Sequence, residues 1–169
     1  MVIFKKIAAQ GKYQDDNAIH DLISYICRPD KTPSHIIGGI GVDFQNIADS
    51  MVAVSMKFRK FNRLRLHHFI LTFNPEDIYI KDMLPKIAEE ICALWGAEFQ
   101  IVYSLHEDTD HPHIHFVWNN VSYIDGHKCH FGITEYNRTI GYIKHILGNY
   151  SLYPVIPVKY IPNTLQPHE

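Results

Sequence analysis

Apolar residues recur along this chain with two kinds of spacing, and each kind predicts a different element. Spacings of three and four residues put apolar side chains on one face of a helix. They predict helices over 16–27, 44–60, 80–95 and 134–148. Shorter apolar or alternating stretches, bounded by turn residues, are typical of strands. We expect strands over 2–8, 66–73, 98–106 and 112–121, and either a short strand or a glycine-rich turn over 36–41.

Turn residues between these segments indicate how the strands are joined. Asn74-Pro75 ends one strand, residues 107–110 (EDTD) form a turn, and Asp125-Gly126 favours a hairpin. Tight turns join antiparallel neighbours, so the fold class is α+β. We expect an antiparallel-rich central sheet with helices mainly on one face. Residues 1–150 form one domain, and residues 151–169 add a C-terminal edge strand and tail to it.

Composition narrows the class of protein. The chain is 46% hydrophobic and 20% charged, which is typical of a folded soluble domain, and it has no apolar run long enough to span a membrane. The first residues lack the apolar region of a signal peptide. Cys27, Cys92 and Cys129 lie far apart in the sequence and make no metal-type pair. We therefore expect reduced thiols, no membrane insertion and a cytoplasmic location.

Net charge argues against a general nucleic-acid binder, because the chain carries −2 and phosphate contacts need basic surface. Two features weaken that argument. The chain has twelve histidines, whose charge can change near neutral pH. The segment 57–65 (KFRKFNRLR) also gathers basic residues around two phenylalanines, a pattern suited to phosphates and stacked bases. Its candidate DNA contacts are Lys57, Arg59, Lys60, Arg63 and Arg65; a solvated helix end is the alternative interpretation.

The most informative segment is 105–120 (LHEDTDHPHIHFVWNN). His113 and His115 share one face of a strand, because side chains alternate along it. An antiparallel hairpin would bring His106 beside them, and three converging imidazoles make a metal site with open positions. Asp108 in the turn could orient an imidazole or take a proton. The alternative is a set of ordinary surface histidines.

The pattern H-x-D-x-x-x-P-H-x-H-x-x-x-N over 106–119 resembles the third motif of plasmid-mobilisation relaxases of the MOB-P/VirD-like type, in the HUH endonuclease superfamily. The segment LISYICRPDKT resembles their first motif and makes Tyr25 the nucleophile. Segments 36–51, 66–77 and 119–128 also match in order, although Val42 stands where relatives often have a smaller residue. The resemblance covers about residues 1–150 without a helicase or primase region, so we expect a minimal relaxase or an excised domain.

This resemblance implies a DNA relaxase that nicks and rejoins one strand at a transfer origin through a 5′-phosphotyrosyl link. It implies that His106, His113 and His115 hold one divalent ion, Mg²⁺ or Mn²⁺ with Zn²⁺ as an alternative, and that Asp108 assists. Lys31 and Asn119 join the basic segment as expected DNA contacts. The implied partners are single-stranded DNA, accessory DNA-binding proteins and a type IV secretion coupling protein.

Other interpretations stay open from the residues alone. Tyr13 competes with Tyr25, because it also lies early in the chain. A rolling-circle replication initiator would use a late tyrosine, Tyr136 or Tyr142. A three-histidine hydrolase would need no tyrosine, and a DNA-binding remnant would have no activity. His67 and His68 should point to opposite faces of their strand, and we expect both to lie in the core or behind the site rather than to ligate a metal.

Overall fold

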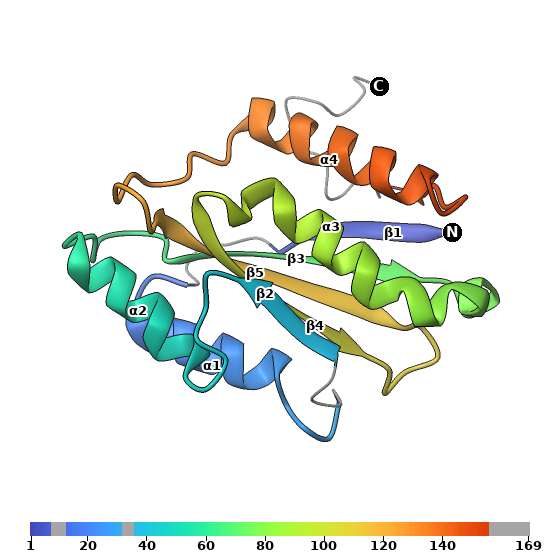
Figure 1. Ribbon diagram of the computed structural model, residues 1–169, viewed down its shortest axis with the longest axis horizontal. Coiled ribbons are helices and arrows are strands. Elements are labelled where there is room, and N and C mark those ends of the chain that lie inside the picture. Colours follow the sequence, from blue (N-terminus) through green and yellow to red (C-terminus); the bar gives the residue numbers. More distant parts are fainter. Residues whose placement is uncertain (8–12, 32–35, 156–169) are drawn as a thin grey trace, which may run out of the picture.

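The computed structural model describes residues 1–7, 13–31 and 36–155 (Figure 1). Most of the expected tail, residues 156–169, lies outside these ranges, as does the end of the first expected strand at Ala8. No helix in the described part of the chain is both long and apolar enough to cross a membrane. The elements, in chain order, are β1 (Val2–Lys6), α1 (Asp16–Ile26), β2 (Ile37–Ile40), α2 (Ile47–Lys57), β3 (Leu66–Phe73), a 3₁₀ segment (Pro75–Met83), α3 (Leu84–Gly96), β4 (Phe99–His106), β5 (His113–Ser122), α4 (Ile133–Gly148) and β6 (Pro154–Val155).

One sheet holds all the described strands, in the order β2-β4-β5-β3-β1-β6. Every neighbouring pair is antiparallel except β1 and β6, which run parallel. The expected α+β class and antiparallel-rich sheet are therefore confirmed, and the residues just after α4 do form an edge strand. The segment 36–41, left open between strand and turn, is a strand that pairs with β4.

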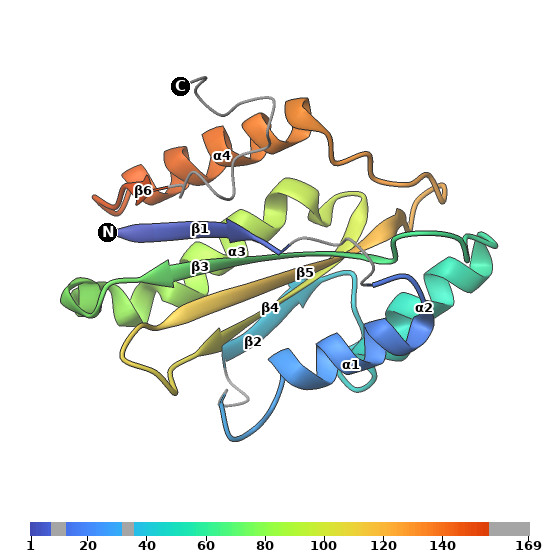
Figure 2. The ribbon, with the colours of Figure 1, turned by 180° about the vertical axis from the view of Figure 1, so that it is seen from behind.

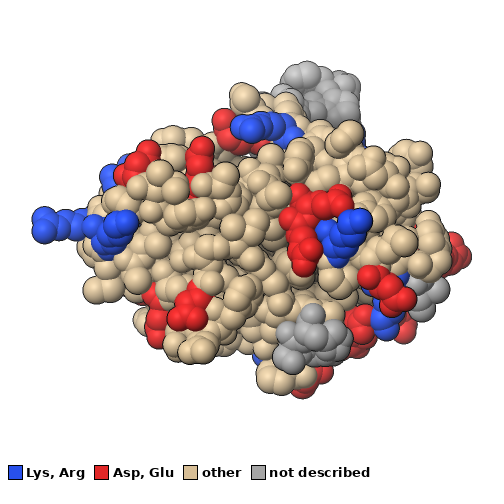
Figure 3. Space-filling view, in the orientation of Figure 1, with Lys and Arg blue, Asp and Glu red and all other residues tan. Residues whose placement is uncertain are grey.

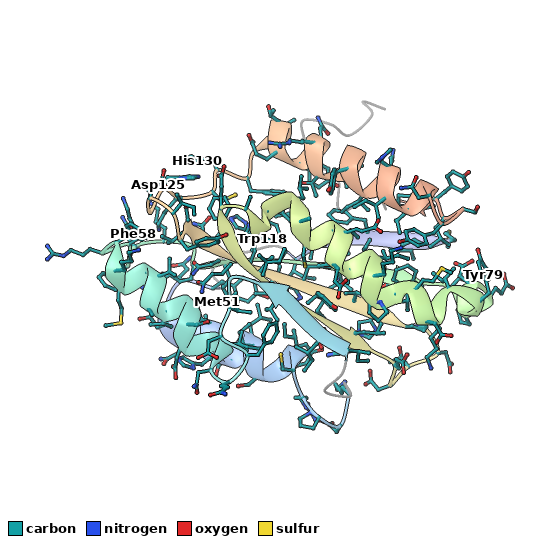
Figure 4. The ribbon with its side chains drawn as sticks, viewed as in Figure 1. Met51, Phe58, Tyr79, Trp118, Asp125 and His130 are labelled. Atoms are coloured by element: carbon teal, nitrogen blue, oxygen red, sulfur yellow. The ribbon has the colours of Figure 1, made fainter. Side chains whose placement is uncertain are left out.

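The helices divide between the two faces of the sheet, so the expectation of helices mainly on one face is wrong in this detail (Figures 1 and 2). Helices α3 and α4 cover one face over the larger apolar cluster. Helices α1 and α2 pack on the other face, where Leu66, Val102 and Val117 offer a smaller apolar patch. Figure 4 labels one residue from each side, Trp118 in the larger cluster and Met51 in the smaller. A pattern of apolar positions cannot show this division, because the central strands β4 and β5 bury both of their faces.

Two helices are shorter than their apolar patterns, for identifiable reasons. The expected helix over 80–95 begins only at Leu84, because Pro85 lacks an amide hydrogen and suits a first helical turn. The 3₁₀ segment precedes it. Helix α2 ends where Arg59 adopts a positive φ of 55° and the amide of Lys60 donates to the Ser55 carbonyl. That left-handed residue closes the helix as a C-terminal cap.

The larger core is centred on aromatic rings of β5. Trp118 is fully buried, and the rings of Trp95 and His67 stack on it at centroid distances of 4.6 and 4.7 Å. Phe116, two residues earlier on the same face, stacks on Phe69 of β3 at 4.6 Å. These contacts join β5 to β3 and α3, so the central strand is held in place from the face opposite to α1.

We expect Trp118→Ala to lower the free energy of unfolding by about 3–5 kcal/mol, the usual cost of emptying a large aromatic site. Urea denaturation followed by far-UV circular dichroism measures this. Ile124→Ala is the control, because that side chain is 61% exposed and its loss should change stability by less than about 0.5 kcal/mol. Equal effects in the two variants would contradict this account of the core.

Candidate active site and metal centre

The pairing of β4 with β5 brings three histidines together. His106 lies directly opposite His113, and Ser104 lies opposite His115. All four side chains leave the sheet on the face that carries α1, since the intervening Leu105 and Ile114 belong to the opposite core. One ring nitrogen of each histidine lies within 4.8 Å of a ring nitrogen of each of the other two. The hairpin expected from the sequence therefore builds the expected cluster.

Each of the three imidazoles has one nitrogen held by a neighbour. The Nε2 of His106 donates to the Ile26 carbonyl at 2.7 Å, and the Nδ1 of His113 donates to the His111 carbonyl at 3.1 Å. The Nδ1 of His115 meets the Nε2 of His68 at 2.9 Å. The remaining nitrogens of His106 and His115 are buried, with no hydrogen-bond partner in the described part of the chain.

Buried nitrogens without a partner are costly unless something else binds them. A divalent cation fits this arrangement, because metal-bound imidazoles commonly donate their second nitrogen to a carbonyl or another polar group. Burial lowers the pKa of His115 to about 2, with further lowering from His68, His106 and His113. Burial also lowers the pKa of His113. Both rings are thus neutral near pH 7, the state that metal ligation requires.

Helix α1 places Tyr25 over this cluster. Asp15 caps the helix by accepting from the amide of Ala18 at 2.8 Å. The buried face of α1, Ile19 to Ile26, packs on the smaller core. Tyr25 lies at the edge of that face and is 45% exposed, with its ring centroid 5.8 Å from that of His115 and 6.1 Å from that of His106. The hydroxyl-bearing ring therefore lies beside the histidines and open to solvent.

Asp108 and Lys31 form an ion pair at 2.7 Å near the same cluster. The hydrogen bond from Lys31 is the main cause that lowers the pKa of Asp108, which makes the carboxylate a weaker proton acceptor while the pair lasts. The Nε2 of His106 is held by the Ile26 carbonyl, and the Asp108 carboxylate is held by Lys31. The pair joins the turn after β4 to the segment after α1.

The adjacent histidines of β3 point to opposite faces, as the strand pattern predicts. His67 lies in the larger core, where its Nε2 meets the Asn120 side-chain oxygen at 2.6 Å. His68 lies behind the histidine cluster and contacts His115 on one side and the Tyr13 hydroxyl on the other. Neither is a member of the three-histidine group. No pattern in the sequence points to the partner of His68, because that contact depends on the pairing of β3 with β5.

Comparison with known proteins identifies this arrangement. A family model described as "Relaxase: MobA/VirD2-like, nuclease domain" matches residues 25–152, which is most of the chain. This chain belongs to the MobA/VirD2-like relaxase family. The match begins at Tyr25 and includes β4, β5 and all three histidines. The family resemblance seen in the sequence is confirmed, and with it the assignment as a relaxase nuclease domain.

Curated relatives agree with the family. The group II intron-interrupted relaxase LtrB of Lactococcus lactis subsp. cremoris (strain MG1363) is 22% identical over 152 residues, which covers 74% of this chain and 27% of that protein. LtrB from Lactococcus lactis subsp. cremoris gives the same values. The chain thus spans about a quarter of the length of these relatives.

Two of the residues expected to contact DNA are buried in the relaxase domain. Arg65 is 4% exposed, donates to the Lys60 carbonyl at 2.6 Å and pairs with Asp16 at 3.3 Å. Asn119 is fully buried and donates to the Met51 carbonyl and to the Gln100 side chain. Both side chains join α1 or α2 to the sheet, so the expectation that they contact DNA is corrected to a structural role.

The other basic residues of 57–65 lie at the far end of the relaxase sheet from the histidines. Leu66, next to this segment, pairs with Asn119, whereas His113 pairs with Thr72. His113 and Asn119 are six positions apart along β5, which is a distance of about 20 Å at the usual rise per residue of a strand. Figure 4 shows Phe58 and Tyr79 at opposite ends of the molecule, and in Figure 3 basic side chains project from the end where α2 finishes. The side chains concerned are exposed: Lys57, Arg59, Lys60 and Arg63.

The late tyrosines lie on the wrong side of the relaxase sheet for the replication-initiator alternative. Tyr136 is 4% exposed, and its ring packs edge-on against Phe4 in the larger core. Tyr142 packs against the same core. Since the histidines leave the sheet on the other face, neither tyrosine lies in the cluster that holds Tyr25.

Burial of His67 makes the stability of the domain depend on pH. Desolvation lowers its pKa to about 4, whereas the unfolded chain would protonate it near 6.5. The unfolded state then binds more protons, so this contribution is complete above about pH 6.5 and is lost as the pH falls toward 4. Urea denaturation at several pH values should show that His67→Phe reduces the slope of stability with pH by about 1.4 kcal/mol per unit within that window. An unchanged slope would contradict a neutral buried His67.

Proposed function

We propose that this domain nicks and rejoins one strand of DNA at a transfer origin, with Tyr25 as the nucleophile. The observation that carries the proposal is the position of Tyr25, exposed at the C-terminal end of α1 and in ring contact with His106 and His115. A scissile phosphate entering from solvent would meet the phenol on one side and the bare imidazole nitrogens on the other. The role follows from that placement together with the family.

The proposed reaction is a transesterification. The Tyr25 oxygen attacks the phosphorus, the bond from phosphorus to the 3′ oxygen breaks, and the DNA is left with a free 3′-hydroxyl and a 5′-phosphotyrosyl link. Reversal rejoins the strand, because the energy of the phosphodiester is retained. His106, His113 and His115 would hold the cofactor, one divalent ion such as Mg²⁺ or Mn²⁺, with Zn²⁺ as the alternative. When bound, that ion supplies polarisation of the phosphate and stabilisation of the charge that develops on it.

A phenol with a pKa near 10 needs help to react at neutral pH. Lys31 can exchange its Asp108 partner for a phosphate oxygen, since both interactions are charge-assisted hydrogen bonds. That exchange would place a cation on the scissile phosphate and free the Asp108 carboxylate to accept the proton of Tyr25. Asp108 therefore acts directly in this proposal rather than through His106.

The DNA strand would run from Tyr25 toward the exposed basic side chains at the end of α2. Phe61 is 49% exposed among them, so a base can stack there while phosphates meet the cations. The chain's charge of −2 gives little attraction for random DNA. Accessory DNA-binding proteins that open the nick region and a type IV secretion coupling protein are the partners that conjugative mobilisation of a plasmid would require.

We expect Tyr25→Phe to abolish the covalent protein–DNA adduct, because phenylalanine has no oxygen to attack phosphorus. The assay uses single-stranded oligonucleotides from the transfer-origin region, labelled at the 3′ end so that the fragment bound through its 5′ phosphate is visible. Denaturing gels with Mn²⁺ or Mg²⁺ present show the adduct.

Tyr79→Phe is the matched control for this experiment, since its ring is 66% exposed and belongs to the 3₁₀ segment rather than to α1, β4 or β5, and it should leave the adduct unchanged. An adduct that survives Tyr25→Phe would overturn the assignment, and its loss in Tyr142→Phe instead would support the initiator alternative. Cleavage without any adduct would point to a three-histidine hydrolase.

Arg63→Ala should weaken binding of single-stranded DNA and reduce the slope of log affinity against log salt by about 0.7, the value for one lost phosphate contact. Fluorescence anisotropy over a range of salt concentrations gives the slope. Lys144→Ala on α4 is the control, because that exposed lysine belongs to the other helical layer. A slope unaffected by Arg63→Ala would remove this segment from the DNA path.

A further inference from the structure

A chain of hydrogen bonds runs from Tyr13 through His68 to His115. The Tyr13 hydroxyl lies 3.2 Å from the Nδ1 of His68, and the Nε2 of His68 lies 2.9 Å from the Nδ1 of His115. The chain ends at the Nε2 of His115, which is buried and has no hydrogen-bond partner in the described ranges. Three segments distant in sequence thus meet behind one nitrogen of the histidine cluster.

His115 differs from the other two histidines of the cluster in what holds its second nitrogen. His106 and His113 each face a backbone carbonyl, which can only accept a hydrogen bond. A carbonyl therefore fixes the proton on the nitrogen that faces it and leaves the other nitrogen bare. His115 faces another imidazole, which accepts in one tautomer and donates in the other. Its tautomer is consequently not fixed by this neighbour alone.

The Tyr13 hydroxyl at the far end of these hydrogen bonds can accept as well as donate, and a divalent ion on the Nε2 of His115 selects the direction in which it accepts. If the Nδ1 of His68 carries the proton and donates to the Tyr13 oxygen, the Nε2 of His68 is bare and must accept from the Nδ1 of His115. The Nε2 of His115 is then bare and faces the cluster. The backbone holds Tyr13 in this place: its carbonyl accepts from the amide of Arg65 at 2.6 Å, and its φ of 57° lies in a region that non-glycine residues rarely adopt.

We propose that Tyr13 and His68 form a positioning chain that keeps His115 in the tautomer with a bare Nε2, ready to bind the divalent ion. This inference rests on the three-histidine metal site of the proposed function. Neither residue touches the reacting atoms, so both act through His115. It also gives Tyr13 a role other than that of a competing nucleophile.

Measurements of metal affinity test the positioning chain of Tyr13 and His68 without any DNA reaction. Isothermal titration with Mn²⁺ and with Zn²⁺ compares the wild type with His68→Phe, His68→Gln and Tyr13→Phe. We expect His68→Phe to weaken binding by about 10–100-fold, the usual effect of losing a group that orients a ligand. His68→Gln should restore most of the affinity, because its side-chain carbonyl can accept from the Nδ1 of His115. Tyr13→Phe removes a single oxygen and should cause a smaller, several-fold loss.

His67→Phe is the matched control, since this neighbouring histidine is equally buried but faces the opposite core. Its metal affinity should equal that of the wild type, whatever its effect on stability. Nitrogen-15 NMR of the metal-free protein gives an independent readout: His115 should be protonated at Nδ1 in the wild type and should become a mixture of tautomers in Tyr13→Phe.

The outcomes separate this proposal from the metal site itself. If the wild type binds no divalent ion, both the proposed metal site and the proposed positioning chain of Tyr13 and His68 are contradicted. If the wild type binds and His115→Ala does not, but His68→Phe and Tyr13→Phe bind as tightly as the wild type, only the chain falls. Should His68→Phe fail to fold, the pair His68→Gln and Tyr13→Phe still decides the question, since an unchanged His115 tautomer in Tyr13→Phe would overturn the proposal.

Discussion

The carbonyl of Ile26 is the point on which the site depends. It accepts from the Nε2 of His106 and from the Ser104 hydroxyl, and so ties the C-terminal end of α1 to two neighbouring positions of β4. The carbonyls of a helix's last turn have no partner within the helix, so this one is available for such a contact. The same bond leaves the Nδ1 of His106 bare for a metal and places Tyr25, one residue earlier, above the ring. One backbone oxygen thereby positions both His106, the proposed metal ligand, and Tyr25, the proposed nucleophile.

Burial of the histidines also affects their protonation. The histidines leave the sheet beside the C-terminal end of α1, on a face that is apolar further along and lined by imidazoles here. Desolvation keeps His113 and His115 neutral, and neutral rings can approach one another without repulsion. The aromatic core packs against the opposite face of β5, so the strand that carries His113 and His115 is held in place from the face without the histidine cluster.

Much of the site could be predicted because its parts are close in the sequence. The alternation of His113 and His115 and the turn before them are local, so a hairpin was enough to bring His106 into the cluster. The contact of His68 with His115 could not be foreseen, because it needs β3 to pair with β5 in one particular register. Arg65 was assigned to DNA from the basic segment and Asn119 from the family resemblance, and neither signal shows the helix that covers the side chain. The division of helices between the two faces likewise depends on tertiary packing.

The unequal size of the two apolar cores has a consequence for motion. Regions with fewer buried apolar contacts open at a lower free energy than the rest of a fold. Helix α1 rests on the smaller core, whereas β4 and β5 contribute their other face to the larger one. The histidine platform is therefore the rigid half of the site and the helix bearing Tyr25 is the half that can lift. The proposed covalent attachment to one DNA end would gain from such a division, because the attached strand could move with its helix while the arrangement of the histidines needed for rejoining is preserved.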